Sequence, residues 1–126
     1  QWKVGGDFAD YAKRYIGKIR QPLPGEFAAL NLMHLTHWKR SHYDHIMLHL
    51  HDLGKLDRDF QDNSPQTLFE FPPNSVWLCF TDSVLHAALA GRYALEQTFE
   101  ITIDDMAHPE KSPQRILESL TGRQLC

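Results

Sequence analysis

The sequence has few of the features that would place it in a specialised class of protein. Two cysteines among 126 residues are too few for a disulfide framework, and because Cys79 lies in an apolar run, a reducing compartment is favoured. No apolar run approaches the roughly 20 residues of a transmembrane helix. The net charge of −3 gives no electrostatic reason to expect nucleic acid as a partner. With 42% hydrophobic and 23% charged residues, the chain has the composition of one ordinary globular domain, residues 1–126.

The chain also begins without an initiator methionine. Residues 1–4 alternate in the manner of a strand, and Gly5 and Gly6 then form a turn. We expect the partners of this strand to lie upstream, so that the chain is the C-terminal portion of a longer protein.

Helical signals dominate the first half, about residues 7–62. Asp7 is a plausible N-cap for a helix that runs to about Ile19, and Ser41 with Asp44 has the spacing of a capping pair for a longer helix. Gly54 is expected to weaken that longer helix, with a further turn or two after it. The apolar arc of the longer helix consists of Tyr43, Ile46, Met47, Leu50 and Leu53.

From about residue 67 to 103 the apolar period changes to two, which is typical of strands. We expect strands at 68–71, 76–80 and 84–88, and a long strand after Gly91 that ends at 103. A last helix, about 112–121, starts at Ser112 and ends at Gly122. The sequence therefore predicts an α+β fold, with N-terminal helices, antiparallel strands that suit a β-sandwich or a jelly roll, and a C-terminal helix.

Six of the eight histidines fall between positions 34 and 51. His45 and His49 are four residues apart on one helix face and could reach one metal, with His42 or Asp52 as further ligands. We favour the alternative that these amphipathic rings border the apolar arc. His42 and Asp44 also match the spelling of a His-x-Asp metal pair, but on a helix they point about 200° apart, so we interpret the match as accidental.

The run HDLGK at 51–55 resembles the signature of the HD superfamily of metal-dependent phosphohydrolases. There the adjacent His and Asp, here His51 and Asp52, help to hold a metal that activates water. That superfamily is all-helical, whereas this chain changes to strand patterns within about fifteen residues. An HD-type phosphohydrolase is therefore kept as an alternative function.

His86 is the single histidine of the strand-forming half, and small residues surround it, which suggests the wall of a pocket. Taken alone it reads as a core histidine, and a non-catalytic β-fold binding domain remains a further alternative. The surrounding sequence, however, resembles the C-terminal part of the Kdo hydroxylases, where Kdo is 3-deoxy-D-manno-oct-2-ulosonic acid of lipopolysaccharide. The matching runs are WKVG at 2–5, YDHIMLHLHD at 43–52, FPPNSVW at 71–77, FTD at 80–82, HAALAG at 86–91, LEQTF at 95–99, SP at 112–113, RILE at 115–118 and LTGR at 120–123.

The resemblance implies a dioxygenase that uses Fe(II), 2-oxoglutarate and O2, built on a double-stranded β-helix of the jelly-roll kind. Such enzymes hold iron by two histidines and one carboxylate. His86 matches the distal histidine, while the His-x-Asp pair would lie upstream, so this chain alone is expected to be inactive. No residue is assigned a catalytic role beyond metal binding.

The resemblance also bears on the other ligands. Arg92 and Gln97 are candidates for binding 2-oxoglutarate, although Arg92 could instead be a solvated residue paired with Glu70 or Glu100. A Kdo-containing lipid A precursor would be the substrate, which places the protein in the cytoplasm, with peripheral contact at the cytoplasmic face of the inner membrane.

Overall fold

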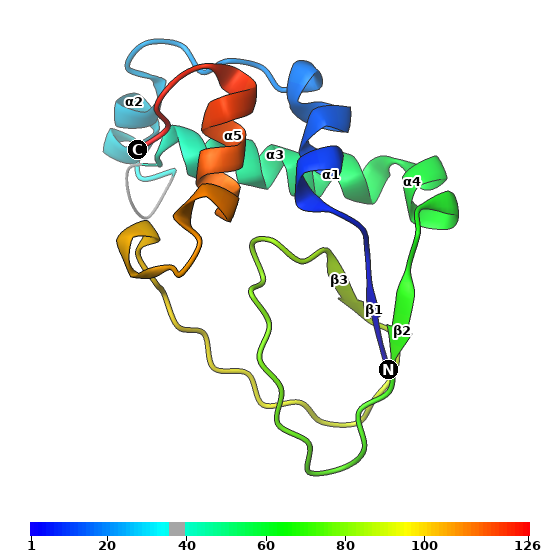
Figure 1. Ribbon diagram of the computed structural model, residues 1–126. Helices are drawn as coiled ribbons and strands as arrows, with labels where there is room; N and C mark the ends of the chain where they lie inside the picture. Colours follow the sequence, from blue (N-terminus) through cyan, green and yellow to red (C-terminus); the bar gives the residue numbers. More distant parts are fainter. Residues whose placement is uncertain (36–39) are drawn as a thin grey trace.

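The computed structural model describes residues 1–35 and 40–126 (Figure 1). The elements in chain order are β1 (Trp2–Val4), α1 (Phe8–Tyr15), η1 (Ile16–Lys18), α2 (Glu26–Leu32), α3 (His42–Leu56), α4 (Arg58–Asn63), β2 (Thr67–Phe69), β3 (His86–Ala88), η2 (Ile103–Asp105), η3 (Pro109–Lys111) and α5 (Pro113–Thr121). Helix α3 runs across the molecule, with the small sheet at one side of it (Figure 1). None of the described helices is long and apolar enough to cross a membrane.

The helix ends confirm the local signals of the sequence. The Asp7 carboxylate accepts hydrogen bonds from the backbone N–H groups of Ala9, at 2.8 Å, and Asp10, at 3.1 Å, and so caps α1. Ser41 and Asp44 form a reciprocal capping box at the start of α3. Helix α3 continues through Gly54 to Leu56, and the short helix α4 follows it, in line with the further turn or two that the sequence predicts.

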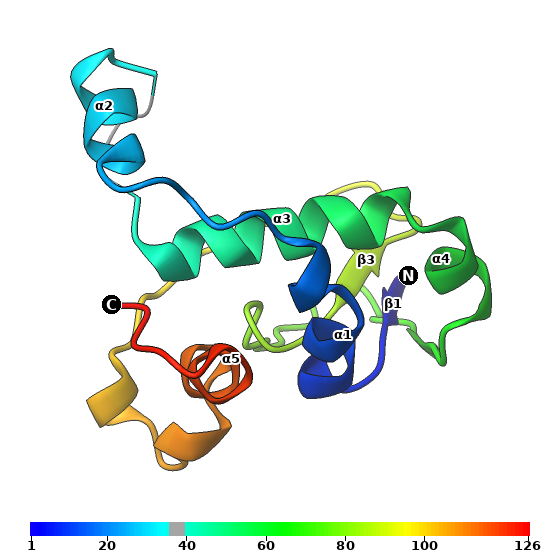
Figure 2. The same ribbon diagram turned by 90° about the horizontal axis from the view of Figure 1, so that it is seen from above.

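The hydrophobic core lies between α1, α3 and α5. Its centre includes Tyr15 and Leu50, each 1% exposed, and Leu117, which is fully buried. Figure 2 shows α1 and α5 along the same side of α3, so the C-terminal helix closes the core of the N-terminal helices. The buried members are Phe8, Tyr11, Ala12, Tyr15, Ile46, Leu50, Leu117 and Leu125. Three helices that are distant in sequence therefore form one platform, on which the sheet is held.

The sheet has three antiparallel strands in the order β2-β1-β3. Strand β1, predicted at the start of the chain, is thus confirmed, but its partners are not upstream. Trp2 pairs with Phe69 on one side and with Ala88 on the other. Later segments of the same chain pair with both edges of β1. Strand β3, which carries His86, therefore lies beside the N-terminus.

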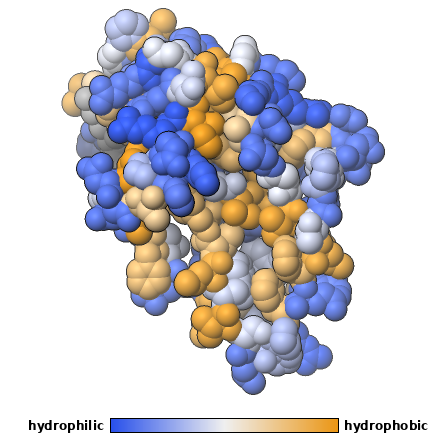
Figure 3. Space-filling model, in the orientation of Figure 1, coloured by the Kyte–Doolittle hydropathy of each residue, from blue (hydrophilic) through white to orange (hydrophobic). Residues whose placement is uncertain are grey.

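Two predicted strands are absent from the described part of the chain. Residues 76–80 and 92–102 adopt no regular structure, and most of their side chains are exposed to solvent: Val76 is 93% exposed and Tyr93 97%. A strand needs a neighbour to satisfy its backbone N–H and C=O groups, and both sides of β1 are already occupied. The period-two pattern is therefore present without the sheet, and apolar side chains gather on the surface over this half of the molecule (Figure 3).

Candidate functional site

His86 is held in one orientation by its backbone neighbour. Its Nδ1 lies 2.7 Å from the carbonyl oxygen of Val84. A carbonyl can only accept, so Nδ1 carries the hydrogen and, in the neutral ring, Nε2 keeps its lone pair. The residue is exposed at the first position of β3. A histidine that donates through Nδ1 to a carbonyl and leaves Nε2 free has the usual arrangement of a metal ligand.

The sheet has two chemically different faces at His86. Val4 is the register partner of His86, and Lys3 is that of Ala87, so side chains of these pairs alternate between faces. The His86 ring stacks on Trp2, with ring centroids 5.7 Å apart and an angle of 25° between planes. It therefore lies on the face that carries Trp2, opposite to the face of Lys3.

A cavity of about 350 Å³ lies on the Lys3 face, between the sheet and helices α3 and α4. Residues 84–87 form part of its wall, as predicted, but the His86 ring does not face the cavity, because it is stacked on Trp2 on the other face. The polar lining includes Lys3, Lys55, His51 and Asp82. The remaining lining residues are Gly5, Phe8, Tyr11, Met47, Leu50, Gly54, Phe60, Gln61, Ser64, Gln66, Thr81, Val84, Leu85 and Ala87.

The segment that leads into His86 is tied to the helices at two points. The Tyr43 hydroxyl of α3 donates to Asp82 at 2.9 Å. Burial of Tyr43, with the Asp82 charge beside it, raises the pKa of the phenol well above its usual value, so this donor stays protonated. The Gly5 N–H donates to the Leu85 carbonyl at 2.6 Å, and Leu85 packs on the helical core. The sequence did not indicate the Tyr43–Asp82 contact, because its partners are 39 residues apart.

Arg92 and Gln97 are not brought to His86. Both are exposed and lie in the irregular segment that follows Gly91. No ion pair joins Arg92 to Glu70 or Glu100 among the residues that the structure describes. Without the long strand, no repeating geometry places either side chain beside the histidine.

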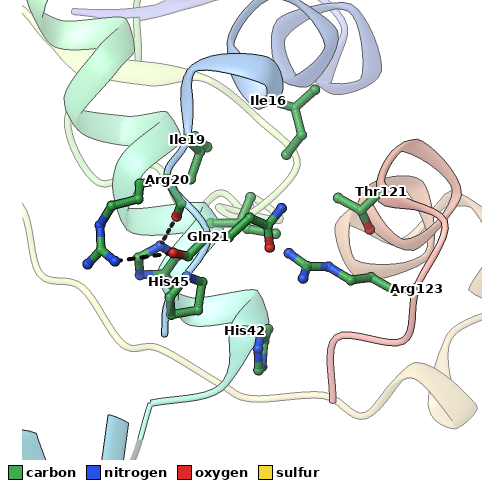
Figure 4. Close-up of a pocket in the computed structure, with 10 residues that line it drawn as sticks. Ile16, Ile19, Arg20, Gln21, His42, His45, Thr121 and Arg123 are labelled. Atoms are coloured by element: carbon green, nitrogen blue, oxygen red, sulfur yellow. Dashed lines mark hydrogen bonds between the residues drawn. The ribbon is translucent and has the colours of Figure 1, made fainter. Parts of the chain in front are cut away.

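Two of the four histidines of α3, His45 and His49, are hydrogen-bonded to backbone carbonyl groups. Nε2 of His45 lies 2.9 Å from the Arg20 carbonyl oxygen, and Nδ1 of His49 lies 2.8 Å from the His45 carbonyl oxygen. His45 is 5% exposed and borders a void of about 20 Å³, room for about one water molecule (Figure 4). His42 packs edge-on against Phe27, at 5.3 Å between centroids. His37 falls outside the described residues.

No group of three potential ligands exists in residues 1–35 and 40–126 that could hold a metal. The scaffold interpretation of His45 and His49 is supported by their hydrogen bonds to backbone carbonyl groups. Asp44 is committed to the capping box, as the helical interpretation of the His42–Asp44 match requires.

His45 gives a testable pH dependence. Burial lowers the pKa of His45 below 6.5, so the unfolded chain binds its proton more readily than the folded chain. The stability that neutral His45 contributes is present above pH 6.5 and is lost as the pH falls through the lowered folded value. In thermal melts from pH 7.5 to 5.5, wild type will therefore lose more stability than His45→Gln, which retains a donor toward Arg20. The exposed His51→Gln variant is the control and should follow wild type; parallel curves for wild type and His45→Gln would contradict the prediction.

His51 and Asp52 do not form an HD-type centre. Both are exposed on α3, and Nδ1 of His51 lies 3.3 Å from Oδ1 of Asp52. The helix carrying them packs in a domain with a three-stranded sheet, and this is not an all-helical bundle. The pair is a neighbour contact on a solvated helix face, so the phosphohydrolase alternative is not supported.

The structure thus combines helices with a small antiparallel sheet, and His86 stands on that sheet with its Nδ1 bonded to the Val84 carbonyl. The family model described as 3-deoxy-D-manno-oct-2-ulosonic acid (Kdo) hydroxylase matches residues 1–124, and the chain belongs to this family. No curated protein matches.

Solved structures agree with that assignment. The chain is similar to the Kdo hydroxylase KdoO, a non-heme Fe(II) alpha-ketoglutarate dependent dioxygenase, in complex with alpha-ketoglutarate and Fe(III), with a TM-score of 0.93 and 45% identity. The same values hold for KdoO with cobalt(II) and for KdoO with succinate and Fe(III). Each match covers 98% of this chain and 42% of the KdoO chain. The chain thus spans less than half the length of these solved relatives.

Proposed function

We propose that this chain is the C-terminal portion of an Fe(II)/2-oxoglutarate-dependent dioxygenase that hydroxylates the Kdo sugar, and that His86 is one of its iron ligands. The observation that carries the proposal is the orientation of His86, whose Nδ1 is bonded to the Val84 carbonyl while Nε2 has no hydrogen-bond partner among residues 1–35 and 40–126. It supports this role because the chain belongs to the Kdo hydroxylase family and is 45% identical to a relative solved with Fe(III) and alpha-ketoglutarate.

The donor set of this chain fits iron only in part. Sites of this class need two histidines and a carboxylate, and the described residues offer His86 without a second and third ligand nearby. We therefore assign the remaining ligands to chain outside these 126 residues. When bound, iron with 2-oxoglutarate and O2 supplies the oxidant that hydroxylates the sugar. The role of His86 would be to hold its Nε2 in a fixed position toward the iron.

Arg92 and Gln97 retain proposed roles toward 2-oxoglutarate. An arginine can hold a carboxylate by two parallel hydrogen bonds, and Gln97 can donate or accept one. Both need residues 92–103 to become a strand that continues beyond His86. The exposed apolar side chains of that segment support such pairing, because burying them would be favourable.

The fold proposal follows from the same segments. Residues 67–103 would form part of a double-stranded β-helix, or jelly roll, within a single domain, with strands from the rest of the oxygenase pairing with 76–80 and 92–103. Closure of a sheet in this way removes exposed strand edges. The helical part, about 7–62, and the helix at about 112–121 would support the barrel from outside.

The substrate and location are part of the proposal. A Kdo-containing lipid A precursor would be hydroxylated at the cytoplasmic face of the inner membrane, with the protein bound there peripherally. Family membership supports the sugar, and the two free cysteines, Cys79 and Cys126, agree with a reducing compartment.

The test compares this chain alone with a reconstituted enzyme, in which the chain replaces the part of the solved KdoO that it matches. We expect the isolated chain to form no succinate from 2-oxoglutarate, because it carries one ligand. We expect the folded reconstituted enzyme to form succinate and to add one oxygen atom to a Kdo-lipid A acceptor, as measured by mass spectrometry.

Two outcomes would contradict the proposal. A reconstituted enzyme that folds and binds Fe(II) but hydroxylates no Kdo acceptor would remove the assigned activity. Succinate formation at an enzyme-like rate by the isolated chain would show that His86 acts with other ligands, and His42 and Asp44 would then be the first pair to mutate.

A further inference from the structure

Trp2 lies directly beside the proposed iron ligand. Its ring is offset-stacked on His86 at 5.7 Å, within the range of favourable aromatic contacts. Trp77 meets Trp2 edge-on, at 4.9 Å and 67°, and Phe71 lies parallel to Trp77 at 5.0 Å and 6°. Successive ring contacts thus join His86, Trp2, Trp77 and Phe71, and Phe69 continues the row at 6.3 Å from Phe71, so His86 is at one end of it.

The backbone fixes this contact by register. The β1–β3 pairing sets Trp2 opposite Ala88 and Val4 opposite His86, so Trp2 and His86 are diagonal neighbours on one face. Hydrogen bonds outside the pairing hold the same register, from Gly5 N–H to the Leu85 carbonyl and from Leu89 N–H to the Gln1 carbonyl at 2.9 Å. A slip by one residue would move Trp2 to the opposite face.

The contact with Trp2 restricts a rotation of the His86 ring that the hydrogen bond to Val84 does not restrict. The bond from Nδ1 to Val84 sets the direction of one ring atom, but the exposed imidazole can still tilt about that bond. A flat ring against its face restricts the tilt. A side chain that is already ordered loses less conformational entropy when a metal binds, and partners of a ligand outside the coordination sphere tune affinity in this way.

We propose that Trp2 is a positioning residue that holds the His86 imidazole in its metal-binding orientation; this inference rests on the proposed function. Trp77 contacts Trp2 edge-on, and among the residues that the structure describes no ring contact joins Trp77 to His86. Removal of the ring at position 2 should therefore weaken metal binding more than removal of the ring at position 77.

The experiment uses the reconstituted enzyme and Co(II), whose absorption spectrum reports ligand geometry directly. We expect Trp2→Val to raise the Kd for Co(II) roughly 10- to 100-fold and to alter the spectrum, as other supporting partners of metal ligands do. Trp2→Phe, which keeps a flat ring, should recover most of the affinity. Trp77→Val removes a ring of equal size without contact to His86 and is the matched control.

The outcomes separate the two proposals. Unchanged Co(II) affinity in folded Trp2→Val, or equal weakening by Trp77→Val, overturns the role of Trp2 and leaves His86 in place. If Trp2→Val does not fold, Trp2→Met keeps the bulk without a plane and must show the same weakening relative to Trp2→Phe. Wild-type enzyme whose Co(II) binding is insensitive to His86→Ala overturns both the proposed ligand and its positioning residue.

Discussion

Replacing His86 by alanine in the reconstituted enzyme will abolish succinate formation and weaken Fe(II) binding by more than about 100-fold, because even the supporting partners of a metal ligand are worth roughly 10- to 100-fold. The fold should survive, since His86 is exposed and the register of β3 with β1 is held by backbone hydrogen bonds. Turnover of 2-oxoglutarate and Fe(II) titration measure the effect, with a thermal melt to establish that the variant is folded.

His51→Ala is the matched control for that experiment. His51 borders the same cavity as His86 but is a solvated residue of α3, so its loss should leave turnover within about twofold of wild type. The phosphohydrolase alternative predicts instead that His51→Ala loses activity, since His51 and Asp52 would then bind the metal. Loss of activity in His51→Ala with full activity in His86→Ala would refute the assignment of His86.

The helical half of this fold could be predicted because its signals are local. Asp7 caps the helix that begins at the next residue, and Ser41 meets Asp44 three residues later. A capping side chain and its acceptors are adjacent in sequence, so spacing alone is sufficient to find them. The left-handed Gly122, with φ of 69°, likewise ends α5 where the sequence predicts it.

The strands could be predicted only as tendencies, because a strand is completed by a distant partner. Residues 92–103 have the period-two pattern, yet nothing among the described residues pairs with them, and Leu95 remains exposed. The alternating pattern of residues 2–4 is no stronger than that of residues 92–103. Segments 67–69 and 86–88 pair with residues 2–4, however, so these form the central strand. Register, and with it the contact between Trp2 and His86, is a property of three segments together.

The candidate site, like the fold, could be predicted only where its signals are local in the sequence. The resemblance of the surrounding sequence predicts His86 as a metal ligand, and this role also stays a prediction; only its bond to the Val84 carbonyl is observed, and that bond is local. Arg92 and Gln97 depend on a strand that does not form, so their roles stay predictions. The hydrogen bond from Tyr43 to Asp82 joins two halves of the chain, and no spacing rule could have found it.

Gly54→Ala will destabilise the chain by about 1–3 kcal/mol, the usual cost of overpacking a core. The opposite is expected of an ordinary helix, where alanine in place of an interior glycine gains about 1 kcal/mol. Gly54 is buried in α3 beneath Tyr11, and a Cβ there would collide with the hydroxyl and the ring of that tyrosine. The collision would also displace a buried hydrogen bond from the Tyr11 hydroxyl to the Leu50 carbonyl.

Chemical denaturation of wild type and four variants, Gly54→Ala, Gly17→Ala, Tyr11→Leu and the double variant, measures the effect. Gly17→Ala is the control, because the Cβ it would introduce lies within 4 Å of no described atom beyond its chain neighbours and its own helix backbone, and its stability should stay within about 0.5 kcal/mol of wild type. Tyr11→Leu combined with Gly54→Ala should lose less than the sum of the two single losses, because the smaller side chain makes room for the new methyl group. Additive losses, or a stabilised Gly54→Ala, would mean that the contact between α1 and α3 is looser than the structure has it, and that the glycine is there for another reason.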